Sequence, residues 1–233
     1  MVANKGLIIK TPPLDVFNQM AADEFFCERM PERYLLRFFN WEKPGITFGF
    51  SQRSAEVLSQ LPKEDIDLPR TRRPTGGGIV FHKKDLTFSF IFHNPGEFNP
   101  HALYEKLHTA VNEAFSKENI NLEILNSKTA SYAVSSPAMD CFSKPVEKDL
   151  MISGKKVLGG ALRKFSDYML YQASFQIDDA REKQDFYSQI FIEAFSQSHS
   201  VSWQEYTAKP QDMEKIGEIA YNKYYNSSWI NRI

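Results

Sequence analysis

Three consecutive glycines, Gly76 to Gly78, constrain the local fold more than any other feature of the chain. Glycine adopts positive φ readily and lets backbone N–H groups come close to a ligand. Arg70, Arg72 and Arg73 precede the glycines, and the strand-like run Ile-Val-Phe-His follows them. Fixed positive charge beside a glycine loop favours a carboxylate or phosphoryl ligand. The segment alone is equally compatible with a glycine bulge on a strand and solvated arginines.

The composition excludes several classes of function. A chain of 233 residues can bury a substantial core, and we expect one domain over residues 1–233 without a separate C-terminal accessory domain. The 28 basic and 29 acidic residues nearly cancel, which argues against nucleic-acid and membrane partners. Two cysteines, Cys27 and Cys141, cannot form a disulfide framework, and no pair has metal-ligand spacing. We therefore expect no bound metal. No apolar stretch approaches the roughly 18 residues of a membrane span, so we also expect a cytoplasmic protein.

The apolar pattern predicts an α+β fold. Helical spacing occurs at residues 17–29, 99–117, 180–196 and about 208–223. Strand-like runs occur at residues 33–39, 46–50, 121–125 and 168–177. Two further pairs of runs predict hairpins: residues 79–81 with 86–92, and residues 149–152 with 156–161. Helices interspersed among hairpin-linked strands favour a mixed or antiparallel sheet over a doubly wound one.

Most standard catalytic motifs are missing from the sequence. It has no Gly-x-Gly-x-x-Gly, no Gly-x-x-x-x-Gly-Lys-[Ser/Thr], no His-Glu-x-x-His and no Gly-x-Ser-x-Gly. Three features are left: the basic glycine loop, Cys141 in a long polar stretch, and a Gly-Lys-Lys turn at residues 154–156 followed by Gly159, Gly160 and Ala161.

Five segments in order along the chain together resemble one family. They are Asn18–Glu24, Trp41–Gln52, Arg72–His82, Asp85–Ser89 and Gly154–Ala161. With these segments the chain resembles the lipoate-protein ligases and octanoyltransferases of the biotin/lipoate protein ligase superfamily. The resemblance runs from residue 18 to about residue 177, and it favours a ligand loop over a bulge for the glycines.

The resemblance implies a class II biotin/lipoyl synthetase-like catalytic domain, with a central mixed sheet flanked by helices. It also implies an apolar tunnel for an octanoyl or lipoyl chain, whose carboxyl end would lie near the glycine loop and Lys156. The acceptor would be a lysine on a lipoyl domain of a 2-oxo acid dehydrogenase or on the glycine-cleavage carrier protein. The implied substrate-binding residues are Arg72, Arg73, Thr75, Gly76, Gly77, Gly78, His82, Gly159, Gly160 and Ala161.

Two mechanisms occur within this family. Ligases use ATP and Mg to activate free lipoate as an acyl-adenylate. Cysteine-type octanoyltransferases need no tightly bound cofactor and take the acyl group from acyl carrier protein as a cysteine thioester. Cys141–Leu150 resembles the Cys-Phe-x-x-Pro pattern of the transferases, and the Gly-Arg-Asn-Asp segment of the ligases is missing. Gly78, however, is ligase-like, because the transferases often carry arginine there.

The leading interpretation is therefore acyl transfer through Cys141, with an ATP-dependent ligase as the alternative. The accessory domain that many ligases append has little room in 233 residues. A thiol with a pKa near 8.5 needs a nearby cation to react as thiolate, and Lys156 is the candidate. Cys27 follows two phenylalanines on a helical face and is expected in the core, while Lys155 is expected in solvent.

One residue departs from the family pattern. Members usually carry a His-Gly-[Ser/Thr] segment on the strand after the lysine hairpin, whereas this chain has Gln172 at the position of the histidine. A role in proton transfer cannot be carried over to Gln172. His82 is a candidate substitute, but a role in shaping the loop is the preferred interpretation of this histidine. The change leaves room for a third interpretation, a non-catalytic module that binds acyl chains or lipoyl domains.

Overall fold

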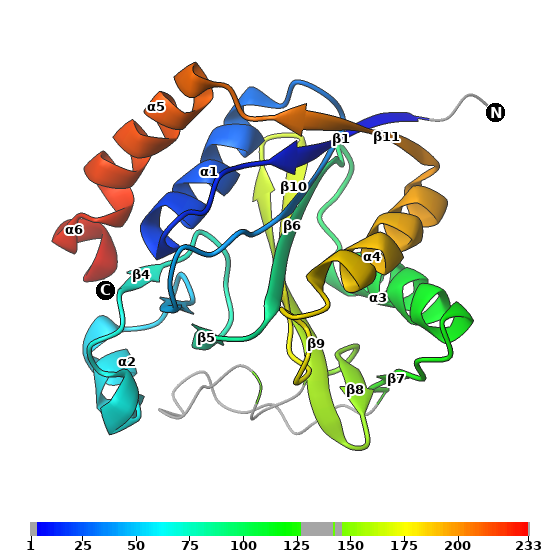
Figure 1. Cartoon of the computed structure of the whole chain (residues 1–233), viewed down its shortest axis with the longest axis horizontal. Coiled ribbons are helices and arrows are strands. Elements are labelled where there is room, and N and C mark those ends of the chain that lie inside the picture. Colours follow the sequence, from blue (N-terminus) through cyan, green and yellow to red (C-terminus); the bar gives the residue numbers. More distant parts are fainter. Residues whose placement is uncertain (1–3, 127–141, 143–145, 233) are drawn as a thin grey trace.

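A mixed eight-stranded sheet forms the centre of the molecule (Figure 1). The computed structural model describes residues 4–126, 142 and 146–232. Within these residues the strand order is β11 (Val201–Thr207), β1 (Asn4–Lys10), β2 (Tyr34–Phe38), β6 (Leu86–His93), β10 (Tyr168–Phe175), β9 (Lys155–Phe165), β8 (Leu150–Ile152) and β7 (Glu123–Ile124). β11 and β2 pair parallel with β1, and the other neighbours pair antiparallel. The predicted α+β class with a mixed sheet is confirmed.

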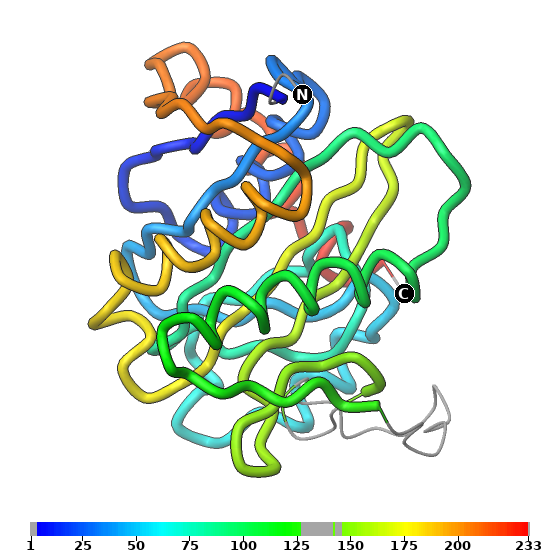
Figure 2. The backbone as a smooth tube through the Cα atoms, turned by 90° about the vertical axis from the view of Figure 1, so that its right-hand side faces the viewer, coloured from blue at the N-terminus to red at the C-terminus, as the bar shows by residue number. Residues whose placement is uncertain are grey.

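Helices cover both faces of this sheet (Figures 1 and 2). One face packs against α1 (Val16–Arg29), α5 (Pro210–Ile219) and the π-helical turn η2 (Ala220–Tyr224), with the short α6 (Ser227–Ile230) beside them. The other face packs against α3 (Pro100–Lys117) and α4 (Gln184–His199). Alternation along β6 supplies both cores, because Phe88 and Phe90 join the α3/α4 side while Ile91 joins the α1 side.

Helix α1 begins and ends at residues suited to those positions. The Asp15 carboxylate accepts hydrogen bonds from the backbone N–H groups of Phe17 (3.1 Å) and Asn18 (2.9 Å), which satisfies two donors at the helix start. Met30 closes the helix in the left-handed region with φ of 31°. Cys27 lies on the buried face of this helix, so its predicted place in the core is confirmed.

A second, three-stranded sheet lies apart from the first. Its order is β4 (Arg70–Arg72), β3 (Gly45–Phe48) and β5 (Val80–His82). It has its own small core of Ile46, Phe48 and Ile79, closed by Val57 of α2 (Ser54–Gln60). The 3₁₀ turn η1 (Lys63–Asp65) leads from α2 toward β4.

The predicted hairpin between residues 79–81 and 86–92 is wrong. β5 pairs with β3, whereas β6 pairs with β2 and β10 in the large sheet. The polar residues that suggested a tight turn connect the two sheets instead. His82 and Asp85 are buried and bonded to each other, so their polarity reflects internal partners and not solvent exposure.

The other predicted hairpin is confirmed as β8 and β9. Its turn residues Ser153 and Gly154 have φ values of 48° and 76°, as tight hairpin turns require. Strands β1 and β11 were not predicted. β11 is an edge strand with mostly exposed side chains, and β1 offers only a short apolar run. Their parallel pairing joins residues almost 200 positions apart, which local patterns do not reveal.

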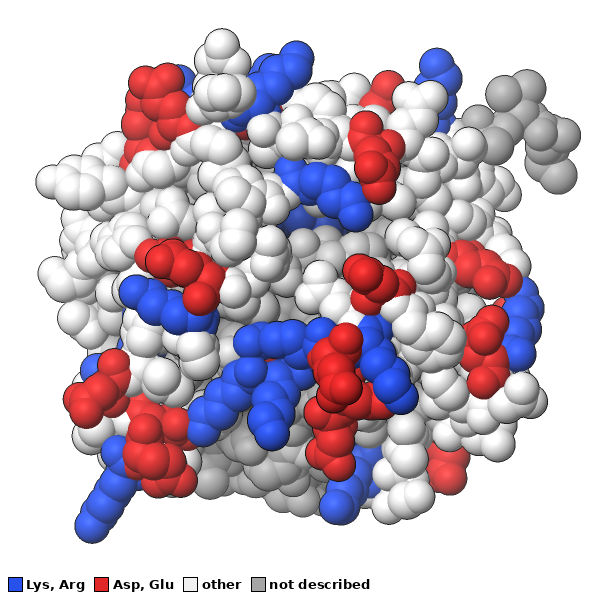
Figure 3. All heavy atoms as spheres, in the orientation of Figure 1, with Lys and Arg blue, Asp and Glu red and all other residues white. Residues whose placement is uncertain are grey.

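Charges of both signs are distributed over the surface. Figure 3 shows Lys and Arg side chains gathered below the middle of one face, with Asp and Glu side chains beside them. Among the described residues, no helix has the length and apolar character needed to cross a membrane.

Candidate active site

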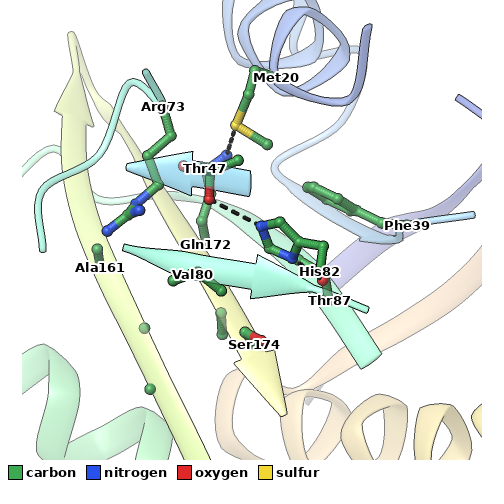
Figure 4. A pocket seen from close by; sticks show the side chains of 13 residues that line it. Met20, Phe39, Thr47, Arg73, Val80, His82, Thr87, Ala161, Gln172 and Ser174 are labelled. Carbon is green, nitrogen blue, oxygen red and sulfur yellow. Dashed lines mark hydrogen bonds between the residues drawn. The ribbon is translucent and has the colours of Figure 1, made fainter. Parts of the chain in front are cut away.

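A cavity lies between the two sheets (Figure 4). The volume that the centre of a water-sized molecule can occupy in it is about 40 Å³. The small sheet supplies one wall through β3 and β5, the large sheet supplies the other through β6, β9 and β10, and α1 contributes a methionine. The lining residues are Met20, Phe39, Thr47, Arg73, Val80, His82, Thr87, Gly159, Gly160, Ala161, Gln172, Ala173 and Ser174. Half of the substrate-binding residues inferred from sequence, Arg73, His82, Gly159, Gly160 and Ala161, are thus brought together here.

The glycine loop packs against the end of β3. Phe50 N–H donates to Thr75 O at 2.9 Å, and Arg73 N–H donates to Phe48 O at 2.9 Å. A Cβ added at Gly49 would lie 1.8 Å from the carbonyl oxygen of Gly77, so this approach requires glycine. Gly77 itself has φ of 91°. The glycines therefore form a shaped loop between β4 and β5, not a bulge within a strand.

The arginines before the glycines bind main-chain carbonyl oxygens. Arg72 is fully buried and donates to the carbonyls of Phe50 (2.5 Å), Gln52 (2.7 Å), Trp229 (3.0 Å) and Ile230 (2.9 Å). Arg70 donates to Ile66 O at 2.8 Å, and Arg73 donates twice to Gly76 O. Arg72 does not line the cavity, whereas Arg73 does. A ligand-binding role for Arg72 stays a prediction, and the structure gives this side chain a role in shaping the loop.

His82 belongs to a buried polar cluster on the cavity wall. Its Nδ1 lies 2.9 Å from Asp85 Oδ2, and its Nε2 lies 2.9 Å from Thr47 Oγ1. Asp85 Oδ2 also accepts hydrogen bonds from Thr87 and Ser174. Burial alone would raise the pKa of Asp85, but the charge of His82 and these hydrogen bonds outweigh burial and lower it. Asp85 is thus held as a carboxylate, which accepts a hydrogen bond from the Nδ1–H of His82.

Lys156 is a buried cation at the start of β9. Its Nζ lies 2.8 Å from Asp149 Oδ2, and the two side chains are only 3% and 5% exposed. The ring centroid of Phe142 lies 5.3 Å from Nζ. A Cβ added at Gly159 would lie 2.3 Å from Lys156 Cε, so the lysine side chain runs across this glycine. Lys156 is not itself among the lining residues, but its charged end lies beside Gly159, which lines the cavity.

Two residues, His108 of α3 and Tyr171 of β10, fix the backbone next to the partner of Lys156. His108 Nδ1 donates to the carbonyl oxygen of Lys148, the residue before Asp149, and its Nε2 accepts from Tyr171 O–H at 2.7 Å. Burial is the main cause that lowers the pKa of His108 and raises that of Tyr171. Both side chains therefore stay neutral at pH 7. The pair fixes the backbone that carries Asp149.

Cys141 lies outside the described residues. Phe142, which follows it in sequence, is described and lies beside Lys156 and Gly159. Within the described part of the chain, no group of three or more His, Cys, Asp and Glu side chains could hold a metal ion.

Sequence reasoning missed several residues of the site. Asp23, Arg37, Thr47 and Ser174 are buried polar residues that bond the cavity wall together. Asp23 and Thr47 lie within the segments that carry the family resemblance, and a charged or polar residue among apolar neighbours was the available signal. Their partners come from other elements of the fold, which the sequence pattern does not reveal.

Known proteins share this architecture. The T. acidophilum protein Ta0514, a candidate lipoate protein ligase solved with bound lipoic acid, superposes with a TM-score of 0.77 at 19% identity and 99% coverage of both chains. A lipoate-protein ligase A solved with ATP gives 0.74 at 19% identity, covering 97% of this chain and 98% of the other. The fold is therefore that of lipoate-protein ligase catalytic domains.

The family follows from a sequence match. Residues 15–221 match the model of the lipoyl protein ligase A/B catalytic domain, and the chain belongs to that family. A curated relative, the octanoyltransferase LipM of Carboxydothermus hydrogenoformans, is 28% identical over 168 residues, which make up 68% of this chain. The matched region spans 60% of that relative's length.

Proposed function

We propose that this protein is a protein-lipoylation enzyme that transfers an octanoyl group to the acceptor lysine of a lipoyl domain through a thioester on Cys141. The observation that carries the proposal is Lys156, a buried cation packed against Phe142, the chain neighbour of Cys141. The LipM relative supports octanoyl transfer. The acceptors would be lipoyl domains of 2-oxo acid dehydrogenases or the glycine-cleavage carrier protein.

The chemistry requires two acyl transfers. The Cys141 thiolate attacks the carbonyl carbon of an octanoyl thioester on acyl carrier protein, the carrier sulfur leaves, and a proton restores its thiol. The neutral acceptor amine then attacks the Cys141 thioester, an amide forms, and the Cys141 sulfur leaves as thiolate while the amine loses a proton. The Lys156 ammonium would stabilise the thiolate and the oxyanions.

Cys27 does not fit this role. Burial, followed by the charges of Asp23, Glu24 and Glu28, raises the pKa of its thiol well above the ordinary value. A buried neutral thiol on α1 is a poor nucleophile at pH 7. Cys27 is therefore a natural control for Cys141.

The alternative function is an ATP-dependent lipoate-protein ligase that forms lipoyl-AMP with ATP and Mg as substrates. The ligase-like Gly78 and the fold likeness to an ATP-bound ligase favour it. The hydrogen bonds of Arg72 and Arg73 weigh against it. Both guanidinium groups donate to main-chain carbonyls, whereas a ligase would need arginines that bind a phosphate.

One experiment separates the alternatives. The protein is incubated with octanoyl-acyl carrier protein without ATP, and intact mass is measured before and after addition of a lipoyl domain. We expect a hydroxylamine-labile octanoyl adduct that Cys141→Ser abolishes and Cys27→Ser retains. Lipoylation from free lipoate that needs ATP and survives Cys141→Ser would establish the ligase instead. Binding of octanoate or a lipoyl domain without either reaction would indicate a non-catalytic module.

A further inference from the structure

Gln172 connects the glycine loop to the large sheet inside the cavity wall. The side chain lies on β10 and is only 6% exposed. Its Oε1 accepts a hydrogen bond from Thr75 Oγ1 at 2.6 Å, and its Nε2 donates to Asp23 Oδ2 at 2.7 Å. Thr75 is fully buried and immediately precedes the three glycines. One side chain therefore joins the loop, the sheet and helix α1.

The chemistry of the partners fixes the orientation of this amide. Asp23 is an acceptor as a carboxylate, so the NH₂ group of Gln172 must face it. The amide oxygen then faces Thr75, whose hydroxyl is the donor. Met20 Sδ lies 3.5 Å from Nε2, next to the same NH₂ group (Figure 4). The reverse orientation would place two acceptors together at Asp23.

Asp23 is itself held by buried partners on two strands. Its Oδ1 accepts from Arg37 Nη2 and Ser89 Oγ, both at 2.6 Å. Arg37 donates in turn to Gln19 Oε1 at 2.6 Å. The chain of bonds from Arg37 through Asp23 and Gln172 to Thr75 is buried along its whole length. A satisfied buried network of this kind specifies one geometry, because each lost bond leaves a buried polar group without its partner.

A second contact anchors the outer part of the loop. Arg163 Nη1 on β9 donates to Pro74 O at 2.6 Å. Arg163 is partly exposed and binds a carbonyl at the start of the loop, whereas Gln172 binds the buried side chain of Thr75, next to Gly76. Arg73 binds Gly76 O from within the loop itself, whereas Gln172 joins the loop to the large sheet through Thr75.

We propose that Gln172 is a positioning residue that fixes the glycine loop against the large sheet, so that the loop can stabilise the charge that develops on the acyl group. The inference rests on the proposed lipoylation function for its consequence in catalysis. The loop geometry is independent of that function. Preorganised backbone N–H groups stabilise developing charge without reorganising during the reaction.

Hydrogen exchange of the loop tests the geometry. Deuterium uptake of peptides covering residues 70–80 is compared for the wild type, Gln172→Leu and Thr75→Val. Each variant should raise loop exchange about tenfold, which corresponds to about 1.4 kcal/mol. The double variant should add little to either single variant, because both changes remove the same bond. Thr75→Ser keeps the hydroxyl and should retain wild-type exchange.

The matched control is Thr11→Val. Thr11 Oγ1 is a buried hydroxyl that makes no hydrogen bond to another described residue, so its loss should leave exchange of residues 70–80 unchanged. Wild-type exchange in both Gln172→Leu and Thr75→Val would overturn the proposal. If Gln172→Leu fails to fold, the pair Thr75→Val and Thr75→Ser decides, because the two differ in whether they retain the hydroxyl.

Kinetics then test the consequence for catalysis. With octanoyl-acyl carrier protein and a lipoyl domain, Gln172→Leu should lower kcat about tenfold and change KM less than about twofold. A lower unfolding temperature of Gln172→Leu with unchanged kcat would mean that the loop is destabilised but still correctly positioned. This result would overturn the proposed role of Gln172 in catalysis. A wild-type protein inactive in both transferase and ligase assays would refute the proposed function and leave the exchange result standing.

Discussion

Lys156 and Asp149 form a buried ion pair, with Nζ and Oδ2 2.8 Å apart. The carboxylate compensates the ammonium in a place where an isolated charge would be costly. Asp149 Oδ2 also accepts from Val146 N–H at 2.7 Å, which orders the chain just after the Cys141 segment. The pair therefore holds the candidate catalytic lysine and the neighbouring loop end in one arrangement.

Removal of Asp149 should destabilise the protein. We expect Asp149→Ala to lower the free energy of unfolding by about 3–5 kcal/mol, because a buried ammonium is left uncompensated. Urea unfolding at pH 7 measures this. The double variant Asp149→Leu/Lys156→Met removes both charges and should recover most of the loss while remaining inactive. A single variant within about 1 kcal/mol of the wild type would contradict the ion-pair interpretation.

Gly159 and Gly160 should respond differently to alanine. A Cβ at Gly160 would lie 2.3 Å from the ring of Tyr171, which His108 holds, so we expect Gly160→Ala to cost about 1–3 kcal/mol. A Cβ at Gly159 meets the end of the Lys156 side chain, so the lysine must shift within its ion pair with Asp149. Gly159→Ala should therefore lower acyl transfer more than stability.

Unfolding curves and single-turnover acylation distinguish the two glycine variants. The control is Gly217→Ala, because a Cβ at Gly217 of α5 meets no atom within 4 Å. Replacing glycine inside a helix should stabilise that control by about 1 kcal/mol at most. Equal losses of activity in Gly159→Ala and Gly160→Ala, with unchanged stability, would argue against this distinction.

Arg72→Lys should lower the stability of the protein. A lysine cannot reproduce the planar donor set that reaches the carbonyls of loop 50–52 and of the C-terminal segment. We expect the free energy of unfolding to fall by about 3 kcal/mol, because several charged hydrogen bonds are lost together. Arg53→Lys, at a side chain 67% exposed, is the control. A variant that keeps full stability but loses affinity for ATP would restore the anion-binding role predicted from the sequence.

The sequence predicted what local patterns and spaced motifs encode. Periodicity located α1, α3 and the β8–β9 hairpin. The ordered motifs predicted one site for the glycine loop and Lys156. The motif order carried this information because the fold brings residues 159–161 and Arg73, which precedes the glycines, to the same cavity.

Long-range pairing was not predictable from these patterns. Residues 82–85 look like a solvated turn, but Asp85 is buried because Ser174 and Arg181, about 90 residues later, bind its carboxylate. From the sequence, Arg72 is a candidate for binding an anion. In the structure its guanidinium instead donates to the carbonyls of Trp229 and Ile230. In each case a charged residue is explained by partners that only tertiary structure provides.

His199 should make the protein sensitive to acid. Burial, and then the charge of Lys106, lowers the pKa of this histidine to about 3. The unfolded chain binds a proton near pH 6.5, so between about pH 6.5 and 3 the unfolded state carries more protons than the native state. The free energy of unfolding should therefore fall as the pH falls through this range, by at most about 1.4 kcal/mol per pH unit from this group.

The test compares stability at pH 7 and pH 5 for the wild type and His199→Phe. Because His199 packs against the rings of Phe90 and Phe92, phenylalanine should fit the site while removing the proton equilibrium. We expect the variant to lose less stability than the wild type on acidification. His101→Phe, at an exposed position on α3, should retain the full acid-dependent loss. Identical losses in wild type and His199→Phe would assign the acid sensitivity to other groups.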